Sequence, residues 1–461
     1  MSKQIALILA AGEGKRMKSN KPKAMAEVVF KPMISWVLDA VSASGIDETI
    51  LVAGHFGEQL VDYVGDKCKV AWQTERLGTG HAVMMAAEHL RATDAENVLI
   101  LNGDAPFMDS ETILESLKLH SENGNAVTVI SAKLQDPTGY GRVIQDVNGR
   151  IERIVEQKDA TEAEKKIQSV NSGAYWFNRE ELLSTLDKLT TENEAHEYYL
   201  TDTIGILKHE RKKTGVYITE NADVVLGAND RVQLLSLNEK ARNKIVRKHL
   251  LNGVDIPCTD GVIIGADVTI ENETQILPNT IIKGRSVIGK DCVLGPNTLI
   301  TDSVVKDGVK LNNVDLEQSV IENGVDIGPF SHIRPNSHLG ENVHVGNFVE
   351  IKNSEIGNGT KVPHLTYVGD SDVGEGCNFG CGSLTVNYDG KNKHRTTIKD
   401  HAFIGCNTNL VAPVTVGEWV FTAAGSTITQ DVPDNALAIA RAKQVNKEGW
   451  VTKKKPYKNM D

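Results

Sequence analysis

A glycine-rich loop near the N-terminus carries residue types that suit phosphate chemistry. The apolar run Ile5–Ala11 leads into Gly12, Gly14 and Arg16, and Lys23 follows a few residues later. Glycines let backbone N–H groups approach phosphate oxygens, and the two cations could neutralise a phosphoryl group during its transfer. The loop lacks the third glycine of a dinucleotide fingerprint and the Gly-Lys-Ser/Thr of a Walker loop. On its own it is therefore a weak signal.

Two further loops, at residues 102–104 and 227–229, follow predicted strands in this half of the chain. Mostly parallel sheets place their ligands at the carboxyl ends of the strands, which is where all three loops begin. A carboxylate such as Asp104 can hold Mg²⁺ between phosphates at such a place. The alternative is an Asx-turn without a ligand, which is the commoner use of an isolated loop aspartate.

Polar side chains also gather in the second half of the chain. His364 is the central one, because a neutral imidazole can act as a general base, although a single histidine is more often a surface or hydrogen-bonding residue. The others lie in segments that a folded repeat could bring together: Arg334, Glu350, Lys352, Tyr367, Asn378, Asn387, Tyr388 and Lys393. They predict a cleft built from residues distant in sequence.

The element that must position this second group is a six-residue repeat. Aliphatic anchors return at every sixth position from Ile264 to Ile300 and, after a break at 304–320, from Ile321 to Ile351, with later phase slips up to Val416. A period of six fits neither a helix nor an ordinary strand. It is typical of a parallel β-helix, in which stacked coils bury the anchors in one column. A β-sandwich with glycine-rich turns is the less favoured alternative.

The element that must position the first group is a mostly parallel sheet. Apolar runs at 4–11, 49–53 and 97–101 alternate with helical patterns at 33–44, 58–64, 80–90 and 110–122. This alternation predicts βαβ units. Further on, a helical pattern starts at Asn229 or Asp230 and stops at 252–253, with one charged face, so it predicts a helix that joins two domains.

Composition limits the classes of function. The chain has 461 residues, of which 40% are hydrophobic, so it can form more than one globular domain. Its net charge of −11 argues against nucleic-acid or membrane-surface binding. We expect a cytoplasmic protein, because neither a secretory pattern nor a membrane-spanning run is present. The six cysteines form no CxxC pair and are expected to stay reduced. The basic tail, residues 441–458, is either a solvated end or a phosphate-binding segment.

The phrase around the glycine loop is more specific than the loop alone. It comprises Leu9, Ala10, Ala11, Gly12, Gly14, Arg16 and Met17, then Pro22 and Lys23, and it resembles the signature of sugar-nucleotide pyrophosphorylases, although Lys15 stands where that family commonly has Thr. Phrases at residues 73, 77–82, 139–142, 155–158 and 170–173 follow in the order and spacing of uridylyltransferases acting on N-acetylglucosamine 1-phosphate.

This resemblance implies roles for individual residues. Uracil would be read by Gln73, Gly78 and Thr79, and the sugar would be held by Gly141, Glu156 and Asn171. The nucleotide would also contact Leu9, Ala10, Ala11, Gly12, Lys23 and Asn229. Asp104 and Asn229 would bind Mg²⁺, and Arg16 and Lys23 would neutralise charge while the sugar phosphate attacks UTP.

The segment 361–370 around His364 closely resembles the catalytic coil of glucosamine-1-phosphate acetyltransferases. The resemblance implies that His364 removes a proton from the amine that attacks acetyl-CoA, and a carboxylate such as Glu350 could orient the ring. The sugar phosphate would be bound by Arg334, Lys352, Tyr367, Asn378 and Lys393, the last acting across a trimer interface. Acetyl-CoA would be met by Cys381, Asn387, Tyr388, Cys406, Ala424 and Arg441. Related enzymes often have Ser at the position of Cys406.

The resemblance covers essentially the whole chain, including the closing segment 447–450. It is to the bacterial bifunctional enzymes that acetylate glucosamine 1-phosphate and couple the product to UTP, giving UDP-N-acetylglucosamine for cell-wall precursors. It implies a Rossmann-like α/β nucleotidyltransferase domain at 1–229, a linker helix at 230–252, and a left-handed parallel β-helix of hexapeptide repeats with a basic tail at 253–461. It also implies a homotrimer. The alternative is a single-activity pyrophosphorylase whose β-helix serves only regulation or assembly.

Overall fold

The computed structural model describes residues 3–146, 149–193 and 195–456, so the last two residues of the predicted basic tail lie outside the described residues. The chain divides into two compact units, Met1–Asn243 and Lys244–Asp461. The boundary falls within helix α8 (Arg231–Leu251), which is the predicted joining helix. Asp230 caps this helix, because its Oδ1 accepts hydrogen bonds from the backbone N–H groups of Val232 and Gln233.

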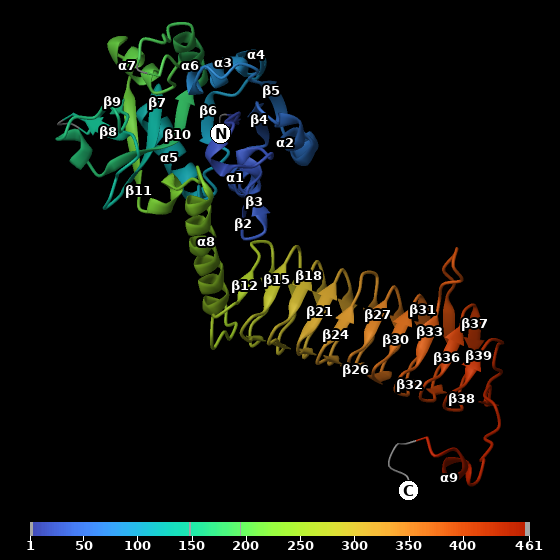
Figure 1. Ribbon diagram of the computed structural model, residues 1–461. Coiled ribbons are helices and arrows are strands. Elements are labelled where there is room, and N and C mark those ends of the chain that lie inside the picture. Colours follow the sequence, from blue (N-terminus) through green and yellow to red (C-terminus); the bar gives the residue numbers. More distant parts are fainter. Residues whose placement is uncertain (1–2, 147–148, 194, 457–461) are drawn as a thin grey trace. The chain divides into compact units, whose positions relative to one another are not determined.

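The first unit is built on a mixed, mostly parallel sheet with the strand order β11-β7-β10-β6-β1-β4-β5 (Figure 1). Strand β10 runs antiparallel to β6 and β7, while the other neighbours in this order pair in parallel. A hairpin of β8 and β9 lies beside β10. The strands are β1 (Gln4–Ala10), β4 (Glu48–Ala53), β5 (Lys69–Trp72), β6 (Asn97–Asn102), β7 (Val127–Lys133), β8 (Arg142–Gln145), β9 (Ile151–Val155), β10 (Ser169–Asn178) and β11 (Thr214–Thr219). A two-stranded sheet of β2 (Glu27–Val28) and β3 (Lys31–Pro32) is separate.

Both faces of the main sheet are covered at its centre, so the central parallel strands β1, β4 and β6 are mostly buried and apolar. In β1, Ile5 and Leu7 belong to one core cluster, and Ala6 and Ile8 belong to the other. The helices that cover the two faces are α1 (Met33–Ala43), α2 (Gly57–Val64), α3 (Thr79–Met85), α4 (Ala87–Ala92), α5 (Ser110–Asn123), α6 (Arg179–Leu186) and α7 (Asp202–His209). The single helix predicted at 80–90 is therefore two short helices, α3 and α4.

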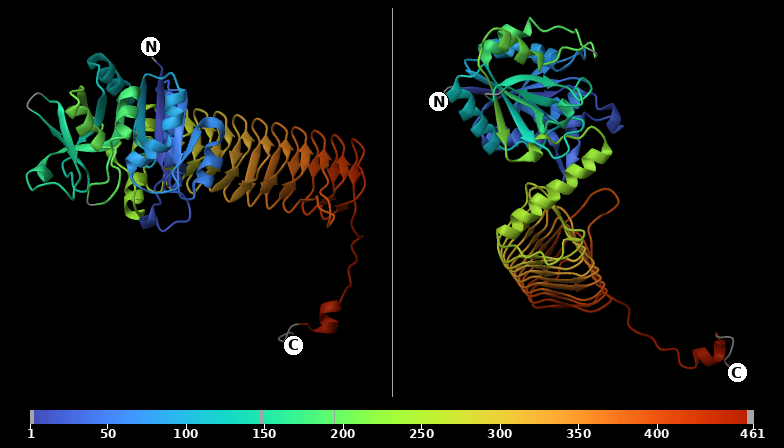
Figure 2. Two further views of the ribbon diagram at one scale, coloured as in Figure 1. Left: turned by 90° about the horizontal axis from the view of Figure 1, so that it is seen from above. Right: turned by 90° about the vertical axis from the view of Figure 1, so that its left-hand side faces the viewer.

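The second unit consists of stacked coils whose strands form three parallel sheets (Figures 1 and 2). We name each sheet after its first strand. The β12 sheet contains β12 (Ile263–Ile264), β15 (Ile281–Lys283), β18 (Leu299–Thr301), β21 (Val314–Glu317), β24 (Ser331–Ile333), β27 (Glu350–Lys352), β30 (Tyr367–Gly369), β33 (Leu384–Val386), β36 (Asn409–Val411) and β39 (Thr427–Ile428).

The other two sheets follow the same scheme. The β13 sheet contains β13 (Thr269–Ile270), β16 (Val287–Ile288), β19 (Val304–Val305), β22 (Val320–Ile321), β25 (His338–Leu339), β28 (Glu355–Ile356), β31 (Ser371–Val373), β34 (Thr396–Ile398) and β37 (Val414–Val416). The β14 sheet contains β14 (Gln275–Ile276), β17 (Val293–Leu294), β20 (Lys310–Leu311), β23 (Asp326–Ile327), β26 (His344–Asn347), β29 (Lys361–His364), β32 (Asn378–Phe379), β35 (Phe403–Ile404), β38 (Phe421–Thr422) and β40 (Leu437–Ala438). Helix α9 (Trp450–Lys454) lies in the basic tail.

The predicted aliphatic anchors are buried, which confirms the parallel β-helix. The predicted break at 304–320 is wrong, because Val305, Leu311 and Leu316 fill the anchor positions there. These coils are shortened at their corners, so the strands stay in register although the sequence loses its phase. Thr385 also takes an anchor position, and its Oγ1 accepts a hydrogen bond of 2.8 Å from the N–H of Gly369.

All six cysteines have free thiols, as expected. Among the described residues, none of the helices combines the length and the apolar character that crossing a membrane requires.

The close stacking of coils gives a stability prediction at Gly346. A Cβ at this position would lie 1.9 Å from the carbonyl oxygen of Pro363 on the next coil. We therefore expect Gly346→Ala to lower the free energy of unfolding of the β-helix by about 1–3 kcal/mol, the usual cost of overpacking. Urea unfolding followed by circular dichroism measures it.

The matched control is Gly265→Ala, which also follows an anchor. Its Cβ would meet its nearest neighbour, Cα of Lys283, at an ordinary 3.4 Å. Equal unfolding midpoints for the two variants would contradict the proposed packing.

Candidate active sites

The three predicted loops of the first unit meet around Lys23. This residue begins the short helix η2 (Lys23–Met25), and its Nζ forms an ion pair with Asp104 and donates a 2.7 Å hydrogen bond to Oδ1 of Asn229. Only 14% of the Lys23 side chain is exposed. The oxygens of Asp104 and Asn229 thus converge on one cation. Carboxylate and amide oxygens are the ligands that Mg²⁺ prefers, so this pair fits the implied metal.

A cavity of about 350 Å³ lies next to this cluster. Its lining includes seven of the predicted residues, namely Leu9, Ala11, Gly12, Gln73, Gly78, Thr79 and Asp104. Ala10 is not part of the lining but packs against Gly103, whose added Cβ would lie 3.1 Å from that of Ala10. Arg16, on the short helix η1 (Lys15–Met17), is exposed and does not line this cavity either.

A second cavity of about 200 Å³ holds the predicted sugar residues Glu156 and Asn171. It shares four lining residues with the first cavity: Leu9, Thr79, Asn102 and Glu197. Gly141 lies directly behind it, because a Cβ there would be 3.3 Å from Oε1 of Glu156. The nucleotide and sugar residues therefore line adjoining spaces.

Several lining residues were not predicted. Asn102 lines both cavities. It begins the predicted strand-end loop of residues 102–104, so its place in the sequence could have identified it. Glu197 and Tyr199 come from a segment without regular structure, where no periodicity could reveal them. Arg76 also lines the first cavity and forms an ion pair with Glu13 of the glycine loop.

In the second unit, outward residues of the β12 sheet bring the predicted phosphate ligands together. Arg334 donates a 2.7 Å hydrogen bond from its Nη1 to Oε1 of Glu350. Lys352 follows on the next coil in line with Arg334, and the neighbouring ammonium of Lys393 lowers the pKa of Lys352, together with some burial. This contact joins two residues of one chain, whereas the resemblance implied that Lys393 acts on an adjacent subunit. Three cations gathered in this way favour an anionic ligand.

A hydrogen-bonded network lies beside these cations. Nδ2 of Asn387 donates to Oδ2 of Asp370, and it lies 3.3 Å from the hydroxyl of Tyr367. Oδ1 of Asp370 accepts a 2.6 Å hydrogen bond from Asn353. Asp370 was not predicted as a site residue, although it ends the coil phrase that contains His364.

His364 ends strand β29, and its side chain is exposed. Oε1 of Glu350 accepts the hydrogen bond from Arg334, and among the described residues no hydrogen bond joins Glu350 to His364, so an orienting role for Glu350 stays a prediction. Asn378 points outward from β32, the strand that follows β29 in the β14 sheet. The hydroxyl of Tyr388 donates to the carbonyl of Gly390 in the same loop, away from the Asn387 network.

The remaining predicted cofactor residues lie along one corner of successive coils. The carbonyl of Cys381 accepts a 2.8 Å hydrogen bond from the N–H of Asn407, and that of Cys406 accepts one from Gly425. Ala424 lies in the turn after Thr422, and the side chain of Arg441 lies next to Gly425. Cys381, Cys406, Ala424 and Arg441 are thus neighbours in space.

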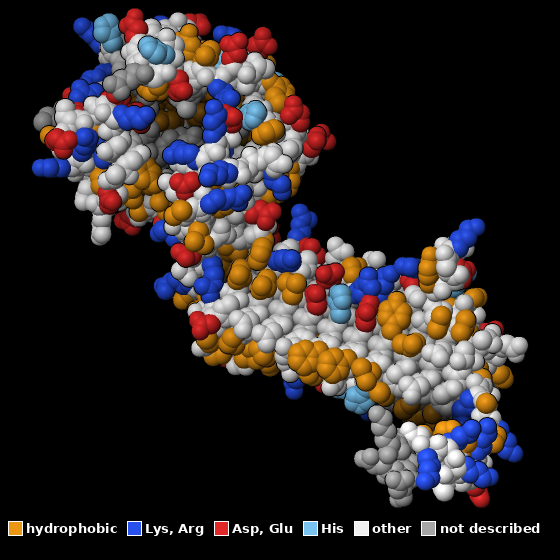
Figure 3. Space-filling view, viewed as in Figure 1, with side chains coloured by type: hydrophobic (Ala, Val, Ile, Leu, Met, Phe, Trp, Pro, Cys, Tyr) orange, Lys and Arg blue, Asp and Glu red, His pale blue; other side chains and the backbone are white. Residues whose placement is uncertain are grey.

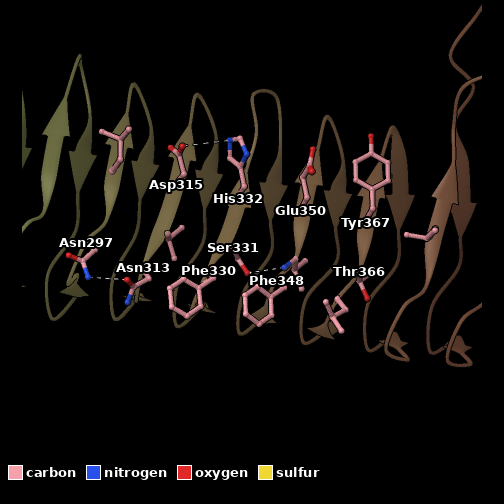
Figure 4. A pocket seen from close by; sticks show the side chains of 15 residues that line it. Asn297, Asn313, Asp315, Phe330, Ser331, His332, Phe348, Glu350, Thr366 and Tyr367 are labelled. Atoms are coloured by element: carbon pink, nitrogen blue, oxygen red, sulfur yellow. Dashed lines mark hydrogen bonds and ion pairs between the residues drawn. The ribbon is translucent and has the colours of Figure 1, made fainter.

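A groove of about 750 Å³ runs along the β12 sheet, with a polar row and an apolar row (Figure 4). The polar row contains Asp315, His332, Glu350 and Tyr367, one from each of four successive coils, and Oδ2 of Asp315 lies 4.0 Å from Nε2 of His332. The apolar row contains Phe330 and Phe348, whose rings stack with centroids 5.5 Å apart, and Leu365. Figure 3 shows a corresponding line of hydrophobic side chains along one edge of the coils.

Two different family models match the two halves of the chain. A family model described as "Nucleotidyl transferase" matches residues 5–224, and one described as "Bacterial transferase hexapeptide (six repeats)" matches residues 267–302 and 318–353. The hexapeptide match, with the three parallel sheets, confirms the predicted left-handed β-helix. The first match, with the mixed sheet, confirms the predicted α/β nucleotidyltransferase domain.

Relatives match this chain over nearly its whole length. The chain is 50% identical over 447 residues to "Bifunctional protein GlmU" of Thermoanaerobacter pseudethanolicus, covering 97% of each chain. It is 48% identical over 451 residues to the protein of that name from Caldanaerobacter subterraneus, covering 98% of each. With the one from Geobacillus sp., the identity is 46% over 459 residues, covering 100% of each.

Glu156 gives a prediction about pH. Burial, and to a lesser extent the charge of Asp159, raises the pKa of Glu156 above its ordinary value of about 4.5. The folded chain therefore binds this proton more tightly than the unfolded chain, and the associated stability is present below about pH 4.5 and is lost as the pH rises through the folded pKa. We expect Glu156→Gln to raise the thermal unfolding temperature of the first unit at pH 7–8, and to raise it less as the pH falls towards 5.

The same substitution at exposed Glu220 is the control and should change the unfolding temperature little at either pH. A Glu156→Gln variant that is equally or less stable than the parent chain at neutral pH would contradict the desolvation of Glu156.

Proposed function

The chain belongs to the family of bifunctional GlmU proteins, and on that premise we propose how its residues divide two group-transfer reactions. It is a bifunctional transferase of UDP-N-acetylglucosamine synthesis. The hexapeptide domain transfers acetyl from acetyl-CoA to glucosamine 1-phosphate, and the nucleotidyltransferase domain couples the product to UTP. We assign uridylyl transfer to residues 1–229, a linker to 230–252 and acetyl transfer to 253–461, and we place the enzyme in the cytoplasm.

In uridylyl transfer, a phosphate oxygen of N-acetylglucosamine 1-phosphate attacks the α-phosphorus of UTP. A new P–O bond forms, the bond to the β-phosphate breaks, and pyrophosphate leaves. Lys23 holds its ammonium at the meeting point of the strand-end loops, and Arg16 brings a second cation from the glycine loop. Asp104 and Asn229 would hold Mg²⁺, which would supply further positive charge for the phosphate oxygens.

Base and sugar selection follow from the two adjoining cavities. Nε2 of Gln73 donates a 3.0 Å hydrogen bond to the carbonyl of Gly78, which leaves the side-chain oxygen of Gln73 to accept the N–H of uracil. Glu156 and Asn171 supply oxygens to sugar hydroxyls in the second cavity, where Gly141 leaves room for the Glu156 carboxylate.

The observation that carries the acetyltransferase assignment is the cationic cluster of Arg334, Lys352 and Lys393. The ammonium groups of Lys352 and Lys393 repel each other, which lowers the pKa of Lys352. The phosphate of glucosamine 1-phosphate relieves this repulsion and fixes the sugar beside Tyr367 and Asn378.

In acetyl transfer, the amine nitrogen attacks the thioester carbon of acetyl-CoA. The C–N bond forms and the C–S bond breaks, while His364 takes the amine proton and passes it to the departing thiolate, so free thiol is released. Cys381, Cys406, Ala424 and Arg441 hold the cofactor along their corner, together with Tyr388 from the neighbouring loop.

We further propose that the β-helix assembles as a homotrimer through its apolar row. Phe330, Phe348 and Leu365 are 58%, 56% and 58% exposed, and each has a left-handed backbone with φ between 45° and 61°. On neighbouring coils this corner is occupied by Asn297 and Asn313, a residue type that tolerates such angles better. Bulky apolar residues kept in a strained and exposed position support a role in subunit contact.

Substitution at this row tests the assembly. We expect Phe348→Asp to convert a species of three times the chain mass into one of the chain mass, measured by sedimentation, because it places a charge in the contact. Trp419→Asp, at a different corner and equally exposed at 57%, is the control. A Phe348→Asp variant that keeps the mass of the parent chain would exclude this row as the interface.

The two activities should be separable by single substitutions. We expect Asp104→Asn to lower uridylyl transfer, measured by pyrophosphate release, by roughly 100-fold, because it removes the negative charge that pairs with Lys23 and would hold Mg²⁺ at the phosphates. We expect His364→Ala to lower thiol release from acetyl-CoA, in the presence of glucosamine 1-phosphate, by roughly 100-fold or more.

Each variant is the control for the other, since each should keep the activity of the other unit. If either substitution abolished both reactions, the two sites would not be separate. If the parent chain released no thiol, the acetyltransferase assignment would fail.

A further inference from the structure

Asp370 stands out because it is a carboxylate that is almost completely buried. Its residue is 5% exposed, and no other aspartate or glutamate among residues 3–146, 149–193 and 195–456 is buried to this degree. Burying a charged group is costly unless it is hydrogen-bonded and compensated. Each oxygen of Asp370 accepts one side-chain amide N–H, from Asn353 and from Asn387. Its negative charge acts on the nearby cations of Lys352 and Arg395 and favours their protonated forms.

These hydrogen bonds determine which way the amide of Asn387 points. A carboxylate only accepts hydrogen bonds, so the amide atom that faces Asp370 must be the nitrogen. The same nitrogen faces the hydroxyl of Tyr367 at 3.3 Å. Its two N–H groups are thereby directed at Asp370 and Tyr367. The amide oxygen is turned the other way, and in the described part of the chain it accepts no hydrogen bond.

The neighbours of Asn387 place this oxygen on the sugar side of the site. Tyr367 is a proposed sugar ligand, and Asp370 acts electrostatically on Lys352, a proposed phosphate ligand. By contrast, no hydrogen bond joins the Asn387 side chain to Cys381 or Cys406 within the described ranges. Asn387 thus differs in position from the other residues assigned to acetyl-CoA.

We propose that Asp370 is a positioning residue that holds the Asn387 oxygen towards the amine of glucosamine 1-phosphate; this rests on the acetyltransferase function proposed above. A neutral amine has two N–H groups and one lone pair. With one N–H on the Asn387 oxygen, the second N–H stays free for the general base and the lone pair can face the thioester carbon. Asn387 then selects and orients the amine substrate and does not bind the cofactor.

The experiment compares the steady-state kinetics of Asp370→Asn with those of the parent chain. An amide at position 370 can face Asn387 with either end, so the Asn387 amide loses its fixed orientation. We expect KM for glucosamine 1-phosphate to rise roughly tenfold, which corresponds to one lost hydrogen bond. KM for acetyl-CoA should change less than about twofold. Asp326→Asn, an exposed aspartate on the β14 sheet, is the matched control and should change neither value.

A charge exchange separates positioning from plain structural support. In Asp370→Asn with Asn387→Asp, the amide at 370 can accept from Asn353 and donate to the carboxylate at 387, whose second oxygen again faces the amine. We expect this double variant to regain most of the affinity for glucosamine 1-phosphate. Asn387→Asp alone places two carboxylates face to face and should bind the sugar phosphate poorly.

The outcomes are distinct. A rise in KM for acetyl-CoA alone would show that Asn387 serves the cofactor and would overturn the proposal. A loss of kcat with a lower unfolding temperature, no selective change in KM and no rescue by the exchange would assign Asp370 a structural role and would also overturn it. Failure of the parent chain to release thiol would instead refute the underlying function.

Discussion

The structure of the second unit depends on one constraint, namely that each coil must place a buried side chain, nearly always an aliphatic one, inside each of three sheets. Each buried Ile or Leu contributes about 1.5–3 kcal/mol, and the neighbouring coil supplies the partner that a single coil lacks. Because the anchors are stacked, the backbones pair in parallel register over the whole length of the unit. The outward residues are then stacked as well. Arg334 and Lys352, far apart in sequence, become neighbours for this reason.

The residues that we assign to function lie mainly at outward and loop positions, which this constraint leaves free to vary. The outward side of the β12 sheet carries Asp315 and His332, then Arg334 and Lys352, and then Tyr367, while its interior is aliphatic apart from Thr385. The energetically costly features also border the β12 sheet. They are the buried carboxylate of Asp370, the neighbouring ammonium groups of Lys352 and Lys393, and the left-handed backbone of the bulky residues Phe330 and Phe348. In the first unit, the loops that follow the strands bring residues distant in sequence together, and they converge on Lys23.

Sequence periodicity predicted the β-helix because burial is local and repeats every six residues. It failed at 304–320, where residues are omitted at corners while Val305, Leu311 and Leu316 keep the register. It also missed Thr385, whose hydroxyl is satisfied inside the coil. Most predicted uridylyltransferase residues line the cavities because motif spacing reflects strand ends. Glu197, Asp370 and the position of Lys393 beside Lys352 depend on loop conformation and side-chain networks, which no period encodes.

We infer that coil register, together with the loop that carries Lys393, assembles the phosphate-binding part of the acetyl-transfer site on one chain. A crystal structure of the full chain with glucosamine 1-phosphate and coenzyme A tests it most directly. We expect the phosphate within hydrogen-bonding distance of Arg334, Lys352 and Lys393 of the same chain, with the amine beside His364. A phosphate bound away from Arg334 and Lys352, or an amine remote from His364, would contradict it.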